Sequence, residues 1–193
     1  FDLGLVMAGA VSAGAYTAGV LDFLFESLEA WYQEKEQNPD NCPSHAINIR
    51  AISGSSAGGI LGAITAIHKH RPIHKASPES QTDTGNALYN TWVKQVDIKK
   101  MLECNDLESD GRIRSALDST SLDEIAANLF SLQPEQQIER RYFDKQLHLF
   151  LTYTNLRGVP YAFDMTSPDV KRYEISQHAD YVHFQIGQTP PLN

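Results

Sequence analysis

The chain has 193 residues, of which 41% are hydrophobic and 21% are charged. This is the composition of a globular protein that is long enough to bury a substantial core. Its formal net charge of −8 argues against binding to nucleic acid or to an anionic membrane through bulk electrostatics. No apolar run has the length of a transmembrane helix, and we expect an intracellular location, cytoplasmic or peripheral to a membrane.

The first third of the chain alternates between strand and helix patterns. Residues 2–8 form a nearly continuous apolar run, which predicts a buried parallel strand, and a turn of small residues follows at 9–14. Helical spacing of apolar residues runs from 15 to about 36 and predicts a long first helix. A second apolar run at 46–51 and a second helical pattern at 60–67 complete a βαβα order. That order implies a parallel sheet.

Shorter patterns fill the rest of the chain. The polar residues 68–86 predict a surface loop. Two helices are expected, one at 87–96 and one with a capped start near Ser119. The predicted strands are 146–154, 161–165 and 171–175, of which the last two are expected to pair, and a turn is predicted at 158–160. No internal repeat or composition change divides the chain, so we expect a single domain over residues 1–193.

The first helix carries several aromatic residues. We expect them to lie in the core rather than to form a lipid-binding face. They are Tyr16, Phe23, Phe25 and Trp31.

The turn between the second strand and the second helix carries a chemical motif. Gly54-Ser55-Ser56-Ala57-Gly58 is a G-x-S-x-G pattern with Ser56 at its apex. The elbow glycines, Gly54 and Gly58, allow the chain to reverse where a Cβ would collide, and the serine is held in a strained backbone with its Oγ exposed. The positive end of the following helix favours negative charge nearby. Ser56 is therefore a candidate nucleophile for attack on an ester.

An esterase also needs donors for the oxyanion and a base. In a parallel sheet, the turn at 9–14 would reach the same sheet edge as Ser56, where ligands bind in such folds. We therefore expect the oxyanion donors to be backbone N–H groups of this turn and of the residue after the nucleophile. They are assigned to Gly9, Ala10, Val11, Ala13 and Ala57.

The two turns together resemble those of the patatin-like phospholipase family, which pairs a G-G-G-x-R-G turn after its first strand with a G-x-S-x-G elbow. Residues 14–21 are similar to the family's first helix, and 151–160 resemble a later strand and turn. The resemblance is sharp over 2–67 and weaker over 115–165. It implies a three-layer α/β/α fold with a mainly parallel central sheet.

The resemblance also implies hydrolysis of lipid acyl esters by a Ser–Asp dyad, with no catalytic histidine, no metal and no cofactor. The implied substrate is a glycerophospholipid or another fatty acyl ester. Transient membrane association would accompany such a substrate, and no nucleic-acid partner is implied.

Three departures from the family pattern bear on activity. Ala10 and Val11 stand where the family has glycines, and Val11 disfavours a positive φ that the loop could need. Ala13 stands where the family has arginine or lysine. The family's later Asp-Gly-Gly or Asp-Gly-Ala turn is absent, and the one Asp-Gly pair, Asp110-Gly111, is expected to be a surface turn. We therefore expect the catalytic aspartate to lie outside this chain, which would be an incomplete patatin-like domain.

Two other hypotheses remain open. A catalytically impaired scaffold that binds lipid or a protein partner is favoured by Val11 and Ala13. A Ser-His-Asp esterase or acyltransferase would combine Ser56 with His178 or His183 and the nearby Asp180, in the chain order of α/β-hydrolases.

A metal site is not expected. Histidines cluster at 68–74, but basic side chains suit a helix C-terminus, and no carboxylate or cysteine lies close by in sequence. The two cysteines, Cys42 and Cys104, do not have a metal-ligand spacing.

Overall fold

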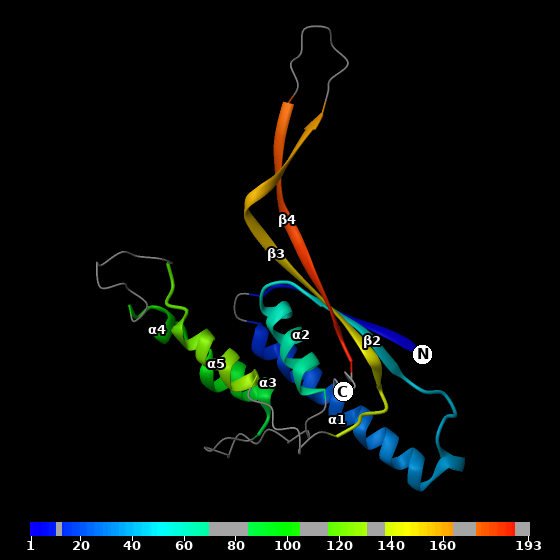
Figure 1. Cartoon of the computed structure of the whole chain (residues 1–193). Coiled ribbons are helices and arrows are strands. Elements are labelled where there is room, and N and C mark those ends of the chain that lie inside the picture. Colours follow the sequence, from blue (N-terminus) through cyan, green and yellow to red (C-terminus); the bar gives the residue numbers. More distant parts are fainter. Residues whose placement is uncertain (11–12, 70–84, 105–115, 131–137, 164–172, 188–193) are drawn as a thin grey trace, which may run out of the picture.

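The computed structural model describes residues 1–10, 13–69, 85–104, 116–130, 138–163 and 173–187 (Figure 1). Its sheet has four strands in the order β1-β2-β3-β4. The strands are β1 (Asp2–Met7), β2 (Asn48–Gly54), β3 (Phe143–Phe163) and β4 (Tyr173–Ile186). β1, β2 and β3 are parallel, and β4 is antiparallel to β3. The predicted mixed α/β fold with a mainly parallel sheet is confirmed.

The described helices follow the predicted order. They are α1 (Gly14–Gln37), α2 (Ala57–His68), α3 (Ala87–Tyr89), α4 (Ile98–Met101) and α5 (Thr120–Phe130), with a 3-10 turn at Pro39–Asn41 and a π-helix at Asn90–Gln95. The helix predicted at 87–96 is thus one short α-helical turn that continues as a π-helix. Most of the predicted loop at 68–86, and with it most of the histidine cluster, lies outside the described residues.

The core lies between α2 and one face of the sheet, and buried side chains of α1 belong to the same cluster. Ile52 of β2 and Leu61 of α2 are fully buried, and Leu149 of β3 is 4% exposed. A Cβ added at Gly62 would lie 3.0 Å from Ile52 and 3.5 Å from Leu149, so the glycine lets α2 pack closely on this face. On the opposite face of the sheet, Val6 is 83% and Tyr181 is 65% exposed. The described residues leave that second face open.

Two sequence predictions of burial were wrong. β1 was expected to be a buried strand, but it is the edge strand of the described sheet, and of its side chains only Met7 is buried. On α1, Tyr16 and Phe23 are 76% and 73% exposed. The buried stripe of α1 is formed by Gly14, Ala18, Leu21, Phe25 and Leu28.

β3 and β4 are longer than predicted and project from the body as a two-stranded ribbon (Figure 1). The turn predicted at 158–160 is wrong, because β3 runs through it. The chain there forms an irregularity in the strand pairing between Thr154 and Val159, with Gly158 at a φ of 69°. The predicted pairing of the outer strands is confirmed by the register, in which Tyr161 lies opposite Ile175.

Candidate active site

Ser56 is the second of the two residues between the end of β2 at Gly54 and the start of α2 at Ala57. Its backbone has a φ of 51° and a ψ of −125°, and among the described residues it is the one non-glycine with a positive φ. Such a conformation costs about 1–3 kcal/mol and persists only where the surroundings enforce it. The Ser56 residue is exposed, so its hydroxyl group is open to a ligand at the sheet edge.

The two elbow glycines leave no room for a side chain. A Cβ at Gly54 would lie 2.3 Å from the carbonyl oxygen of Gly58. A Cβ at Gly58 would lie 2.4 Å from the carbonyl oxygen of Met7, at the end of β1. The G-x-S-x-G spacing therefore has a steric cause here. The first glycine allows the elbow to close on itself, and the second allows it to pack against the neighbouring strand.

The turn after β1 lies directly against the elbow. A Cβ at Gly9 would lie 3.1 Å from the Cβ of Ser56. The N–H of Ser55 donates to the carbonyl of Met7 at 3.2 Å, and Met7 pairs with Gly54 in the strand register. The predicted meeting of the two turns at one sheet edge is thus present in the structure for Gly9.

The structure describes two other predicted oxyanion residues, Ala13 and Ala57. Ala13 is exposed and precedes α1, and its carbonyl accepts a hydrogen bond from the N–H of Thr17 at 3.1 Å. Val11 lies outside the described residues, as does Asp110. Ala57 is buried at the first position of α2.

Two helix N-termini bring positive potential to this edge. The first N–H groups of a helix lack intrahelical acceptors and, with the helix dipole, favour an anion nearby. α2 begins immediately after Ser56, and α1 begins at Gly14, at the end of the turn that starts beside Ser56. Neither helix has an acidic residue in its first turn. The site therefore favours negative charge through its backbone, with no carboxylate in either first turn to oppose it.

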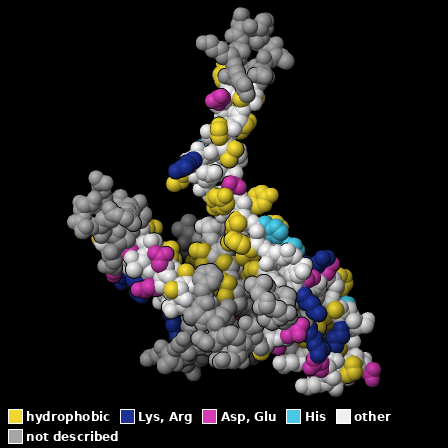
Figure 2. All heavy atoms as spheres, viewed as in Figure 1, with side chains coloured by type: hydrophobic (Ala, Val, Ile, Leu, Met, Phe, Trp, Pro, Cys, Tyr) yellow, Lys and Arg dark blue, Asp and Glu magenta, His cyan; other side chains and the backbone are white. Residues whose placement is uncertain are grey.

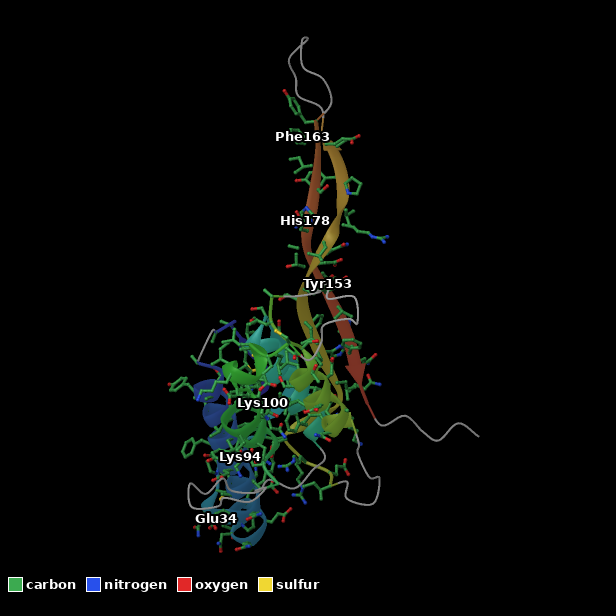
Figure 3. The ribbon with its side chains drawn as sticks, turned by 90° about the vertical axis from the view of Figure 1, so that its left-hand side faces the viewer. Glu34, Lys94, Lys100, Tyr153, Phe163 and His178 are labelled. Carbon is green, nitrogen blue, oxygen red and sulfur yellow. The ribbon has the colours of Figure 1, made fainter. Side chains whose placement is uncertain are left out.

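The residues of the Ser-His-Asp hypothesis have other partners. Asp180 accepts a hydrogen bond from the Tyr153 hydroxyl at 2.8 Å, and this bond raises the pKa of Tyr153. The ring of His183 is hydrogen-bonded to that of His148 at 2.8 Å. His178 lies on the ribbon, above Tyr153 in the view of Figure 3, with its Nδ1 2.8 Å from the carbonyl oxygen of Asn155. The geometry of these side chains therefore gives no support to a triad.

One contact near the site was not predicted from the sequence. Gly14, the buried first residue of α1, packs under the ring of Trp92 from the π-helix. A glycine in the first turn of a long helix, where propensity disfavours it, is the signal that could have suggested a close approach at this point.

Comparison with known proteins gives a family for the chain. The family model described as patatin-like phospholipase matches residues 5–171. A curated protein of Sinorhizobium fredii (strain NBRC 101917 / NGR234), named uncharacterized protein y4iI, is 34% identical to the chain over an alignment of 203 residues. The alignment covers 96% of this chain and 28% of that protein. The chain thus spans less than a third of this relative. No solved structure was found to match the chain.

None of the described helices is both long enough and apolar enough to cross a membrane.

Proposed function

Because the chain belongs to the patatin-like phospholipase family, a family of lipid acyl hydrolases, we propose that it carries the nucleophile and the oxyanion-binding turn of such an enzyme. The observation that carries this proposal is the backbone of Ser56. It is a strained, exposed serine at the start of a helix, with Gly9 of the neighbouring turn packed against it.

The proposed reaction is acyl transfer to Ser56. Its Oγ attacks the carbonyl carbon of the ester while a base removes the hydroxyl proton, and the carbonyl oxygen becomes an oxyanion. Backbone N–H groups of Ala57 and of the turn at Gly9, Ala10 and Ala13 donate to that oxyanion. Collapse of the tetrahedral intermediate releases the alcohol, which takes up the proton. A water molecule then attacks the acyl-enzyme and releases the fatty acid.

The base in this proposal is an aspartate outside the 193 residues. Within the sequence, no Asp-Gly-Gly or Asp-Gly-Ala turn follows the elbow. The relative from Sinorhizobium fredii has most of its length outside the matched region, which is consistent with a longer catalytic unit. The proposed substrate is a glycerophospholipid or another fatty acyl ester, reached by transient contact with a membrane surface.

The test is labelling of the full-length protein with a fluorophosphonate, which reacts with activated serines. We expect the wild-type protein and Ser55→Ala to be labelled, and Ser56→Ala to be unlabelled. Ser55 is the matched control, since it lies in the same turn and loses the same hydroxyl group. A folded wild-type protein that does not react would contradict the proposal.

The altered glycine turn favours a second candidate function, a scaffold that binds lipid without turning it over. Ala13 places no positive charge beside the turn, and Val11 replaces a glycine. In that case the folded protein would bind phosphatidylcholine vesicles but would remain unlabelled by the fluorophosphonate.

A further inference from the structure

We propose that Trp92 is a positioning residue for Ser56 chemistry, because its ring fixes the N-terminus of α1 at the end of the turn that begins beside the nucleophile. This inference rests on the proposed function for its catalytic readout. Its structural part has a readout that does not depend on activity.

The contact between Trp92 and Gly14 is unusually close. A Cβ built on Gly14 would lie 2.4 to 2.6 Å from three carbons of the Trp92 ring. The six-membered part of the indole therefore covers the backbone of Gly14, at a point where any side chain would displace the ring. Gly14 is the first residue of α1, and a Cβ added at Gly9, five positions earlier, would lie 3.1 Å from the Cβ of Ser56. A shift of α1 at Gly14 would pull on the turn that holds the proposed oxyanion donors.

The same segment is attached to α1 at a second point. Asn86, which is 5% exposed, donates its side-chain N–H groups to both carboxylate oxygens of Asp22 at 2.7 and 2.8 Å. Asp22 lies eight positions after Gly14, or about 12 Å along the helix axis. The segment from Asn86 to Trp92 thus runs along the first half of α1 and is fixed to it at both ends. The end at Trp92 is the one at the N-terminus of α1.

The ring of Trp92 acts through its shape rather than through a polar bond. Its indole Nε1 is buried, and no hydrogen-bond partner for it is present among the described residues. A buried donor without a partner is unfavourable, so the indole N–H is not what makes this position suited to tryptophan. Phenylalanine should keep a flat ring over Gly14 without that donor. Trp92 lies in the π-helix, and at the end of that helix the N–H of Val96 donates to the carbonyl of Thr91 at 2.8 Å. Single π-turns of this kind are frequent at functional sites.

The first experiment measures the rate of fluorophosphonate labelling of Ser56 in the full-length protein. We expect Trp92→Ala to slow labelling at least about tenfold, since a small misplacement of catalytic groups has effects of that order. Trp92→Phe should stay within about threefold of wild type. Asn86→Ala, which loses buried hydrogen bonds at the distant attachment, should also label at near the wild-type rate. That result would separate positioning from general destabilisation.

A pair of identical substitutions on α1 provides the reciprocal test. Gly14→Ala should slow labelling as Trp92→Ala does, because its methyl group would push the ring away. Gly19→Ala is the matched control, since a Cβ at Gly19 would have no heavy atom within 4 Å. The double variant with both Gly14→Ala and Trp92→Ala should label no more slowly than Trp92→Ala alone, since residues in contact are not additive. Equal wild-type labelling of Trp92→Ala and Gly14→Ala, both folded, would overturn the inference.

Amide hydrogen exchange gives a readout that does not depend on activity. We expect faster exchange at residues 13–17 in Trp92→Ala and Gly14→Ala, and unchanged exchange there in Gly19→Ala. In Asn86→Ala the increase should fall around Asp22 instead. If the wild-type protein is not labelled, the proposed function fails, and exchange then decides only the structural part of this inference, that Trp92 fixes the N-terminus of α1. Exchange at 13–17 that is unchanged in both Trp92→Ala and Gly14→Ala would refute it.

Discussion

At the scale of single residues, the turn around Ser56 depends on where a Cβ is tolerated. Ser56 carries a side chain in a backbone conformation that favours glycine, while Gly54 and Gly58 lack side chains because backbone atoms occupy the space. The strain at Ser56 is expected where a nucleophile must protrude from a sheet edge. The residue identities therefore follow from sterics at Gly54 and Gly58 and from chemistry at Ser56.

Relief of strain at Ser56 can be measured directly. We predict that Ser56→Gly is more stable than Ser56→Ala by about 1 kcal/mol or more, since alanine keeps the strained Cβ and glycine removes it. Urea unfolding followed by circular dichroism checks this difference. At Ser55, which does not have a positive φ, the order should reverse, with glycine less stable than alanine. The same order at both positions would contradict the strain argument.

Two adjacent glycines of the elbow should respond very differently to alanine. A Cβ at Gly58 would lie 2.4 Å from a backbone oxygen of β1, whereas one at Gly59 would lie 3.3 Å from its nearest heavy atom, the carbonyl oxygen of Gly54. We predict that Gly58→Ala lowers the free energy of unfolding by about 3 kcal/mol or more. Gly59→Ala should change it by less than about 1 kcal/mol, because improved helix propensity offsets the tight contact. Equal losses in urea unfolding would show that steric contact with β1 is not the cause.

At the scale of elements, the start of β3 is tied to α1 by a buried polar network. Arg140, which is 6% exposed, donates to Glu29 of α1 at 3.0 Å and to the Tyr142 hydroxyl at 2.5 Å. The Tyr142 hydroxyl donates to the same carboxylate of Glu29 at 3.2 Å. Burial is the main cause that raises the pKa of Tyr142 to about 12, and the neighbouring Arg140 lowers it in part.

Because of this raised pKa, the free energy of unfolding should depend on pH in the alkaline range. The folded state holds the Tyr142 proton more tightly than the unfolded chain, so its contribution to stability is complete below pH 10 and is lost as the pH rises toward 12. The full loss corresponds to about 2–3 kcal/mol. We predict that the free energy of unfolding falls more steeply between pH 10 and about pH 12 in wild type than in Tyr142→Phe. Parallel curves in urea titrations would contradict the assignment.

Local motifs predicted the elements around the site better than they predicted contacts between elements. The strand, elbow and helix that present Ser56 follow from apolar runs and glycine spacing within about twenty residues. The buried stripe of α1 did not follow, because apolar spacing at Tyr16 and Phe23 cannot indicate which side of the helix meets α2 and the sheet. The contact of Trp92 with Gly14 joins segments nearly eighty positions apart. The sequence pattern predicts a helix there, but not its π-helical turn.

At the scale of the whole molecule, β3 belongs to two environments. Its first part lies in the core, where Leu147 is fully buried and Leu149 is 4% exposed. Its outer part forms the ribbon, where apolar side chains are visible on the surface (Figure 2). The strand register places five of these side chains on one face, and they are between 41% and 55% exposed: Val159, Tyr161, Phe163, Tyr173 and Ile175.

The same substitution at two points of β3 should therefore have different effects on stability. We predict that Leu149→Ala lowers the free energy of unfolding by about 2–5 kcal/mol, because it leaves a cavity between the sheet and α2. Leu156 is 88% exposed, so Leu156→Ala should change it by less than about 0.5 kcal/mol. Urea unfolding at two protein concentrations checks both values. A large loss at Leu156 that grows with concentration would mean that the ribbon is packed against a second copy in solution, whereas a loss independent of concentration would place Leu156 in a folded environment within the chain itself. Either result would contradict the exposure of the ribbon. A small loss of stability at Leu156 beside a large one at Leu149 would instead locate the stability of the fold at the base of β3, next to the elbow that presents Ser56.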